Sequence, residues 1–546
     1  MDDYYRRYRQ PITTTFSAKL FSTALGLFDP LTFVVRVSPG IQKSLERATN
    51  RISAIFWSEE ELLSAVVFLH ETIHWWQYIG TSLGFTESLS VSVQGSSARR
   101  LLQIWSDQYG PRKPTTSAFR EIYSKGTSSE RQLLLNINQN WMDVELSSAV
   151  IHRPYLINGL HSEPYFKSLG RAILRHYVQT YAALEPILKD NFTKLPKVAD
   201  WVNQGNMAAE AGAPDFTEDY LIPGTEITRP GFGAFEIMEG QARLSEIQYL
   251  SVFTHDRFNW QTCVKQGMLS EPYGMAFKYF ITQTNLPWPD NSLAPSVGLF
   301  LLACDITLNP GEIYPFARFC PDTLVKSTHP STRFERVTTA VSKIRSQLLH
   351  NFKYDDDAYL QMSSQLCAVI DEISPNLVAE EIIHLFDGIP GAKSILDGAP
   401  SNVFRLPSIP LKFYIWKHYT LMLDKIQHPA YFCWPAPCSV RMTLNYPQVF
   451  MRNTPPLISP SFDGKIMSTQ SFYGDNSDLE HGLYDYLISQ LLNDVIRQWI
   501  AKPGPFATSY DWIDPGRAPC LWQNIVRDYF KENFDFGIDQ VKVIIR

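Results

Sequence analysis

Two histidines stand four residues apart in the segment HETIHWWQ, which spans His70 to Gln77. On a helix, residues at this spacing lie on the same face one turn apart, so His70 and His74 can hold one metal ion. Glu71 falls beside that point, where a carboxylate can accept a proton from a metal-bound water. The spacing therefore predicts half of a metal site with a candidate general base next to it.

The surrounding residues predict the helix that such a site needs. Ser58 followed by Glu61 is typical of a capping box, and Gly80 is a plausible stop. Apolar residues recur between them at helical spacing, namely Leu62, Ala65, Val66, Leu69, Ile73 and Trp76. We therefore expect a helix from Ser58 to Gly80. The alternative to a metal site on this helix is a pair of buried core histidines.

A complete site needs a third ligand, because catalytic zinc usually has three protein ligands and a water. The best candidate is Glu239 in FEIMEGQARLSEI, a segment that also predicts a helix. Glu236 lies one turn before it and Glu246 two turns after it, on nearly the same face. Either of these could be the ligand instead, or could accept a hydrogen bond from a ligand imidazole.

Together, the two segments resemble the gluzincins, which are HExxH zinc peptidases such as the thermolysin-like and aminopeptidase-type enzymes. In these enzymes a second helix gives a glutamate ligand, and in the aminopeptidase branch that glutamate sits in an E-G-x-A run. The run Glu239 to Ala242 is similar to it. The metzincin class is excluded, because its glycine and third histidine are replaced by Gln77 and Gly80.

The resemblance implies a peptidase in which His70, His74 and Glu239 hold Zn²⁺. Glu71 would act as the general base on a peptide or protein substrate. The chain departs from the family in two respects. The stretch between His74 and Glu239 is much longer than in most gluzincins, and Arg243 stands where the family often has an acid.

A third segment, THPSTRFERV, resembles the H-P-x-x-x-x-R element of membrane-bound zinc peptidases of the prenyl-protein-processing and heat-shock types. This resemblance implies that His329 donates a hydrogen bond to the developing oxyanion. The arginines Arg333 and Arg336 are at +4 and +7 rather than at the family's +6. The alternative is that Pro330 merely starts a helix running to about Leu349.

Two tyrosines are further candidates for the oxyanion donor. Tyr78 lies two turns after His70 on the expected helix, and Tyr220 lies in a loop that precedes Glu239. A function of another class also fits the sequence. The chain could be a non-catalytic binding or scaffold protein that keeps a structural or vestigial metal site, in which case a fourth protein ligand would close the coordination.

Composition narrows the classes of function. The chain has 546 residues, of which 45% are hydrophobic, and this is ample for packed cores in two or three domains. The net charge of −6 gives no global basic field for nucleic acid. The segment MDDYYRRYRQ lacks the apolar core of a signal peptide, and the longest apolar runs are far too short for a membrane span. We therefore expect a soluble, cytoplasmic protein that binds neither nucleic acid nor membrane.

The seven cysteines are scattered without a CxxC pair, which is typical of reduced thiols in a cytosolic protein. Cys433 and Cys438 have His418 and His428 nearby. Their spacing matches no zinc-ribbon or zinc-finger pattern, so we expect these cysteines to be buried in an ordinary core.

The expected fold class is mainly α (α+β), with a zincin-like metallopeptidase core. We expect the catalytic region to span residues 1–350, with a helical insertion over about 95–200. An acidic loop rich in glycine and proline, 205–233, is either a lid or substrate wall or a plain connection. A helical connector over 351–410 leads to a separate C-terminal domain over 411–546, which could bind a protein partner.

Several elements outside the motifs are also predicted. A β-branched run predicts a strand from Leu31 to Val37. Helical periodicity predicts helices over residues 130–140, 165–188 and 479–500. The chain finishes with the strand-like segment VKVIIR.

Overall fold

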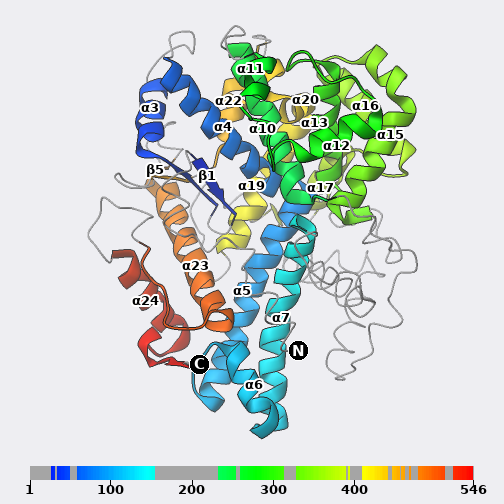
Figure 1. Ribbon diagram of the computed structural model, residues 1–546. Helices are drawn as coiled ribbons and strands as arrows, with labels where there is room; N and C mark the ends of the chain where they lie inside the picture. The colour runs from blue at the N-terminus through cyan, green and yellow to red at the C-terminus, as the bar shows by residue number, and fades with distance from the viewer. Residues whose placement is uncertain are drawn as a thin grey trace.

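Figure 1 shows the computed structural model, which consists mostly of helices with a small sheet on one side. The structure describes residues 26–30, 33–49, 58–153, 231–253, 259–312, 327–388, 392–393, 409–440, 446–455, 457–460, 467–468, 477–510 and 521–544. Tyr220, the expected helix over 165–188 and most of the loop over 205–233 lie outside these residues.

Helices dominate the described residues, so the mainly helical class is confirmed. The first part of the chain forms α3 (Pro39–Thr49), α4 (Glu59–Ile79), α5 (Ser82–Tyr109), α6 (Thr115–Lys125) and α7 (Ser128–His152). The middle forms α10 (Ala234–Phe253), α11 (Trp260–Lys265), α12 (Met275–Thr284), α13 (Pro295–Leu308), α15 (Pro330–Asn351), α16 (Asp356–Val369) and α17 (Pro375–Asp387). The last part forms α19 (Ile409–Gln427), α20 (Pro429–Cys433), α21 (Pro435–Ser439), α22 (Tyr446–Arg452), α23 (Ser477–Ala501), α24 (Leu521–Phe534) and the 3₁₀ helix η7 (Ile538–Gln540).

Helix α4 carries the HETIHWWQ segment, and its ends are where the sequence predicts them. The Ser58 hydroxyl accepts a hydrogen bond from the backbone N–H of Glu61 at 3.2 Å, and the Glu61 carboxylate accepts one from the N–H of Ser58 at 2.7 Å. This reciprocal pair is a capping box, which fixes the start of the helix. At the other end, the N–H of Gly80 donates to the carbonyl of Trp76 at 2.6 Å.

Four short strands form a mixed sheet in the order β1-β2-β4-β5. Strand β1 (Gly26–Asp29) pairs antiparallel with β2 (Val34–Val37), which lies within the expected strand. Strand β2 pairs in parallel with β4 (Leu457–Pro460), and β5 (Met467–Ser468) completes the order. Among the described strands, β1 therefore lies at one edge of the sheet, where it packs against α4.

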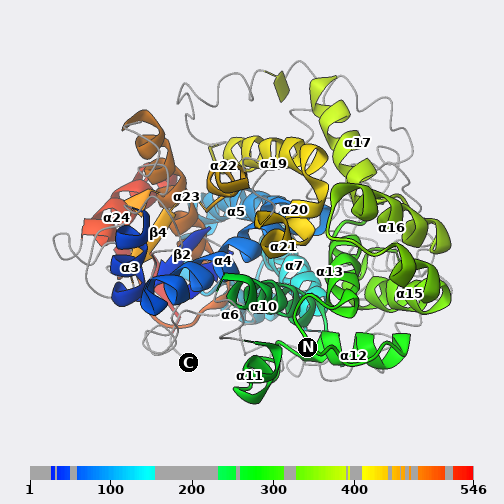
Figure 2. The same ribbon diagram turned by 90° about the horizontal axis from the view of Figure 1, so that it is seen from above.

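Helices α4 and α10 lie side by side near the middle of the molecule (Figure 2). The sheet and α3 lie on one side of this pair, and α13, α15 and α16 lie on the other. Helix α13 forms the centre of that second group, since almost all of its 14 residues are buried.

The apolar helix α13, with 14 residues, is well below the roughly 20 residues that cross a bilayer. No helix in the described part of the chain is both long and apolar enough to cross a membrane.

The C-terminal residues pack directly against α4 and its sheet. Strand β4 supplies the parallel partner of β2, and α19 packs against both α4 and α5. The indole N–H of Trp76 donates to the carbonyl of Asn453 at 2.9 Å, and the Lys425 ammonium donates to the carbonyl of Gly80 at 2.9 Å. Described residues from 411–546, which the sequence suggests as a separate domain, thus contribute a strand to this sheet and a helix that packs on α4. Long-range pairing of this kind leaves no local signal in the sequence.

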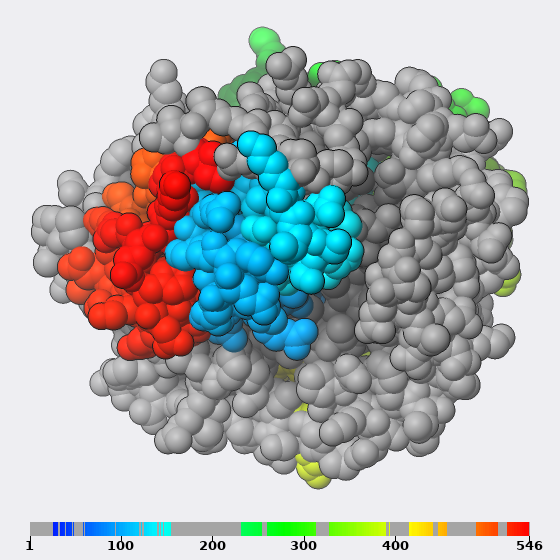
Figure 3. All heavy atoms as spheres, turned by 90° about the horizontal axis from the view of Figure 1, so that it is seen from below, coloured from blue at the N-terminus to red at the C-terminus, as the bar shows by residue number. Residues whose placement is uncertain are grey.

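The long helices α5 and α7 run together away from the sheet, and α6 joins them at their far end (Figure 1). The described part of the expected helical insertion, residues 95–153, comprises the second half of α5 together with α6 and α7. Strand β3 (Arg112–Lys113) follows α5 and pairs in parallel with β6 (Lys542–Val543), which lies in the expected final strand. The lower face accordingly shows the end of the insertion in contact with the C-terminal residues (Figure 3).

Candidate metal centre

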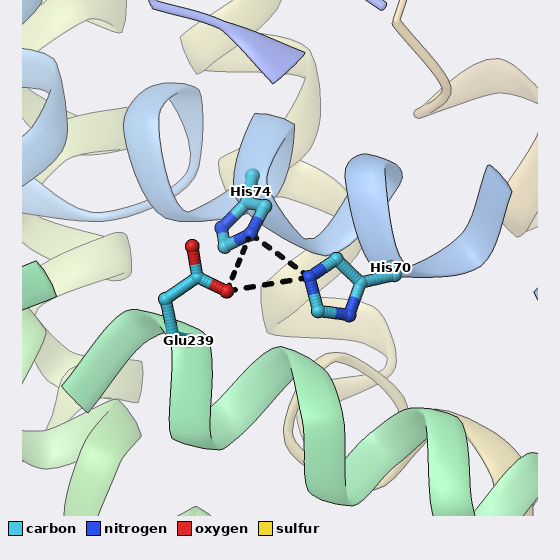
Figure 4. Close-up of side chains that lie close together, drawn as sticks. All are labelled: His70, His74 and Glu239. Atoms are coloured by element: carbon cyan, nitrogen blue, oxygen red, sulfur yellow. Dashed lines mark hydrogen bonds and ion pairs between the residues drawn. The ribbon is translucent and has the colours of Figure 1, made fainter. Parts of the chain in front are cut away.

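Three side chains from two helices converge on one point (Figure 4). His70 and His74 extend from α4, and Glu239 extends toward them from α10. The Nε2 atoms of the histidines are 3.2 Å apart, and Oε2 of Glu239 lies 3.4 Å and 3.6 Å from them. Ligand atoms about 2.1 Å from a tetrahedral zinc ion are separated by about 3.4 Å. The three atoms therefore have the spacing that one such ion requires.

The far nitrogen of each imidazole has an acceptor that fixes the tautomer of the ring. Nδ1 of His70 donates to Oε2 of Glu246 at 3.1 Å, and Nδ1 of His74 donates to Oε1 of Gln77 at 2.7 Å. In the neutral ring, the single N–H is then held on Nδ1, and the lone pair of Nε2 faces the common point. Both histidines thus have the orientation of metal ligands.

Gln77 also ties the two ligand helices together. Its amide nitrogen donates to the carbonyl of Met238 and to Oε1 of Gln241, each at 2.9 Å. Met238 directly precedes Glu239, so one amide group fixes both the ring of His74 and the backbone beside the carboxylate ligand. The sequence alone marks Gln77 only as a residue that excludes the metzincin class. Its position three residues after His74 is the signal that points to this contact.

The two alternative glutamates have other partners. Oε2 of Glu236 accepts a hydrogen bond from the backbone N–H of Gly233 at 2.8 Å, at the start of α10. Glu246 is the acceptor for Nδ1 of His70. Among the three glutamates, Glu239 is therefore the one that completes the group. Glu246 instead accepts a hydrogen bond from Nδ1 of His70, the ring nitrogen that does not face the common point.

Burial makes the charges in this group interact strongly. Burial disfavours the protonated form of His70, but the carboxylates of Glu239 and Glu246 outweigh that effect and raise its pKa to about 10. Burial also disfavours the ionised form of Glu239, yet the neighbouring imidazoles lower its pKa overall. A metal ion that binds here must displace the proton of His70, because only the neutral ring can coordinate it.

Glu71 lies beside the histidines and against the edge strand β1. Burial raises the pKa of its carboxyl group, which also accepts a hydrogen bond from the backbone N–H of Phe28. A glycine permits this close approach, since a Cβ atom at Gly26 would lie 2.9 Å from Oε1 of Glu71 and 2.6 Å from Cγ1 of Val67. Glu71 thus combines a fixed position with a raised proton affinity, the two properties that a general base needs.

A group of hydrogen-bonding side chains lies one turn further along α4. Tyr78 is four residues after His74, and its ring stacks on that of His152, at the end of α7, with the centroids 6.2 Å apart. Burial raises the pKa of Tyr78 well above its usual value, so its hydroxyl keeps its proton. Nε2 of His152 donates to Oε2 of Glu87 on α5 at 3.0 Å. No sequence motif joins His152 to Glu87, so the sequence alone does not identify them.

His329 is not among the residues that converge on the metal centre. Its Nε2 donates to the carbonyl of Val150 at 3.1 Å, and burial lowers its pKa to about 4. The two arginines of the same segment, Arg333 and Arg336, both pair with Glu372, and Arg333 also binds the last carbonyl groups of α13. The alternative interpretation, in which this segment starts a helix, is confirmed by α15.

Comparisons with known proteins give no family assignment to set beside this geometry. The chain matches no family model, no curated protein sequence and no solved structure. The function is therefore inferred from the residues of the site themselves.

Proposed function

We propose that this chain is a zinc-dependent peptidase, which hydrolyses peptide bonds in a peptide or protein substrate. The observation that carries the proposal is the group of His70, His74 and Glu239, whose ligand atoms lie 3.2–3.6 Å apart. Two imidazoles and one carboxylate suit Zn²⁺. Among the described residues, no fourth histidine, cysteine or acid joins the group. A site with three protein ligands leaves a position for water, which is typical of catalytic rather than structural zinc.

The residues around the centre can carry out the steps of hydrolysis. Bound zinc supplies a Lewis acid that lowers the pKa of water and polarises the scissile carbonyl group. Glu71 accepts a proton from the attacking water as the oxygen of that water bonds to the carbonyl carbon. Glu71 then gives this proton to the amine nitrogen as the carbon–nitrogen bond breaks. The carboxylate is thereby restored, and the products are a free carboxyl group and a free amine.

Tyr78 supplies the hydrogen bond to the oxygen that gains negative charge. It follows His70 and His74 at four-residue intervals on α4, so it shares their face of the helix. Its contact with His152 restricts the ring, and its hydroxyl remains protonated. One well-placed donor of this kind lowers the barrier by about 3 kcal/mol. In this proposal Tyr78 takes the role that the sequence assigns to His329.

The test compares Glu71→Gln with the wild type on a mixture of peptides, with cleavage followed by mass spectrometry. Glu71→Gln should keep its zinc and lose turnover by about 10²–10⁴-fold, because the proton acceptor is gone. Glu60→Gln is the matched control, since Glu60 lies on the same helix with its side chain 64% exposed. A Glu71→Gln protein as active as the wild type refutes the general-base role. A zinc-loaded wild type that cleaves nothing favours the binding or scaffold function instead.

A further inference from the structure

Arg243 lies one helical turn after the metal-binding Glu239 on α10, where the gluzincin resemblance predicts an acid. Its Nη1 donates to Oε2 of Glu246 at 2.5 Å, and that same oxygen accepts the hydrogen bond from His70. Its guanidinium carbon lies 4.1 Å from the ring centroid of Tyr273. One edge of the guanidinium is therefore held by Glu246 and one face by Tyr273. Through Glu246 the guanidinium is linked to the metal ligand His70.

One nitrogen of this guanidinium, Nε, does not have a partner in the described part of the chain. Nε of Arg243 is buried and has no hydrogen-bond acceptor among the described residues. A buried donor on a charged group is costly to leave unsatisfied, so it indicates that an acceptor comes from outside. The Arg243 side chain as a whole is 18% exposed, compared with 7% for Glu246, so part of this side chain reaches solvent although Nε itself is buried.

The stacked and ion-paired arrangement restricts the guanidinium before any ligand arrives. The contact with Tyr273 sets the plane of the group, and Glu246 sets its rotation within that plane. A guanidinium held in this way loses little conformational freedom on binding. Its N–H groups match a planar carboxylate in both geometry and charge.

We propose that Arg243 binds a carboxylate of the substrate through Nε, so that the site selects peptides with a negative charge near the cleaved bond. This inference rests on the proposed peptidase function. The carboxylate belongs either to an acidic side chain or to the C-terminus of the peptide, and both sources present the same chemistry. Arg243 is then a specificity-determining residue in addition to its support of Glu246.

The experiment uses the zinc-loaded protein and three synthetic peptides of otherwise identical sequence. One peptide carries a glutamate and a free C-terminus, the second replaces the glutamate with glutamine, and the third has a C-terminal amide. The value of kcat/KM for each is measured by mass spectrometry. The wild type should cleave the first peptide about 10–100-fold faster than the peptide that lacks the recognised carboxylate, and the peptide that loses this rate identifies the source of the carboxylate.

Two variants separate recognition of the substrate from support of the metal. Arg243→Lys keeps a positive charge near Glu246 but removes the Nε donor, so the preference for the peptide with the recognised carboxylate should fall to about threefold or less. Glu246→Gln keeps an amide oxygen that can accept from Nη1 of Arg243, so the guanidinium stays oriented and the preference should persist even though zinc affinity falls. Zinc content is measured for every variant.

The outcomes distinguish this inference from the function on which it rests. If the wild type cleaves all three peptides at equal rates, carboxylate recognition is refuted and the peptidase function stands. If Arg243→Lys retains the full preference, Arg243 acts only through Glu246 and the inference is overturned. If the zinc-loaded wild type cleaves no peptide, both the peptidase function and the inference fail.

Discussion

Replacing Gln77 with leucine tests the contact that joins the two ligand helices. The change removes three hydrogen bonds, one from Nδ1 of His74 at 2.7 Å and one each to Met238 and Gln241 at 2.9 Å. Leucine fills a similar volume, so the three partners remain buried without a hydrogen bond. At about 1 kcal/mol for each lost bond, the free energy of unfolding should fall by about 3 kcal/mol.

Zinc binding should weaken in the same variant. The ring of His74 is no longer held in the tautomer that presents the Nε2 lone pair, and the loss of such a partner reduces metal affinity by about 10–100-fold. This factor corresponds to about 1.4–2.8 kcal/mol of binding free energy. Competition with a chromophoric chelator measures the zinc affinity, and urea denaturation of the metal-free protein measures the stability.

The matched control for this prediction is Gln77→Glu. A glutamate at this position still accepts the hydrogen bond from His74, but it cannot donate to the carbonyl of Met238. It should therefore lose stability while keeping more of the zinc affinity than Gln77→Leu does. If Gln77→Leu binds zinc as tightly as the wild type, the tautomer argument is wrong. If both variants unfold at the wild-type urea concentration, the amide does not join the helices.

Three further predictions concern the base, the oxyanion donor and a buried histidine. Gly26→Ala should lower turnover by at least about tenfold without loss of zinc, because the new Cβ displaces the Glu71 carboxylate; wild-type turnover would contradict this. Tyr78→Phe should lower kcat by about 100-fold with little change in KM, and an unchanged kcat removes Tyr78 from the mechanism. His329 is neutral when folded because its pKa is about 4, whereas the unfolded chain takes up a proton near 6.5. Above pH 6.5 the histidine is neutral in both states, and the stabilisation from keeping it neutral is fully present. As the pH falls to 4, the free energy of unfolding should decrease by about 3 kcal/mol, because only the unfolded chain takes up the proton readily. His329→Gln should flatten that slope in urea titrations at several pH values, and an unaltered slope would assign the acid sensitivity to other groups.

The helices that carry the motif were accessible to sequence reasoning because their signals are local. Ser58, Glu61 and Gly80 lie in or beside α4 and define both of its ends. The amphipathic helix expected over 479–500 is α23, and the helix expected over 330–349 is α15. Two metal-binding histidines on one helix face follow from the same local geometry.

The parts that sequence reasoning missed depend on contacts between distant residues. Val34 pairs with Leu457 in the sheet, and no periodicity in either segment specifies the other. The aromatic and proline-rich composition of residues 411–546 predicts burial but does not say against which surface. The contact between His152 and Glu87 is hidden for the same reason, because each residue lies on its own long helix without a motif.

Elemental analysis of the purified protein determines whether His70, His74 and Glu239 form one zinc centre. We expect close to one zinc per chain in the wild type and a large loss of zinc in Glu239→Gln. The matched variant Glu236→Gln should keep its zinc, because Glu236 binds the backbone of Gly233 at the start of α10. A folded wild type that stays free of zinc after incubation with the ion would contradict the claim, as would a Glu239→Gln variant that binds zinc like the wild type.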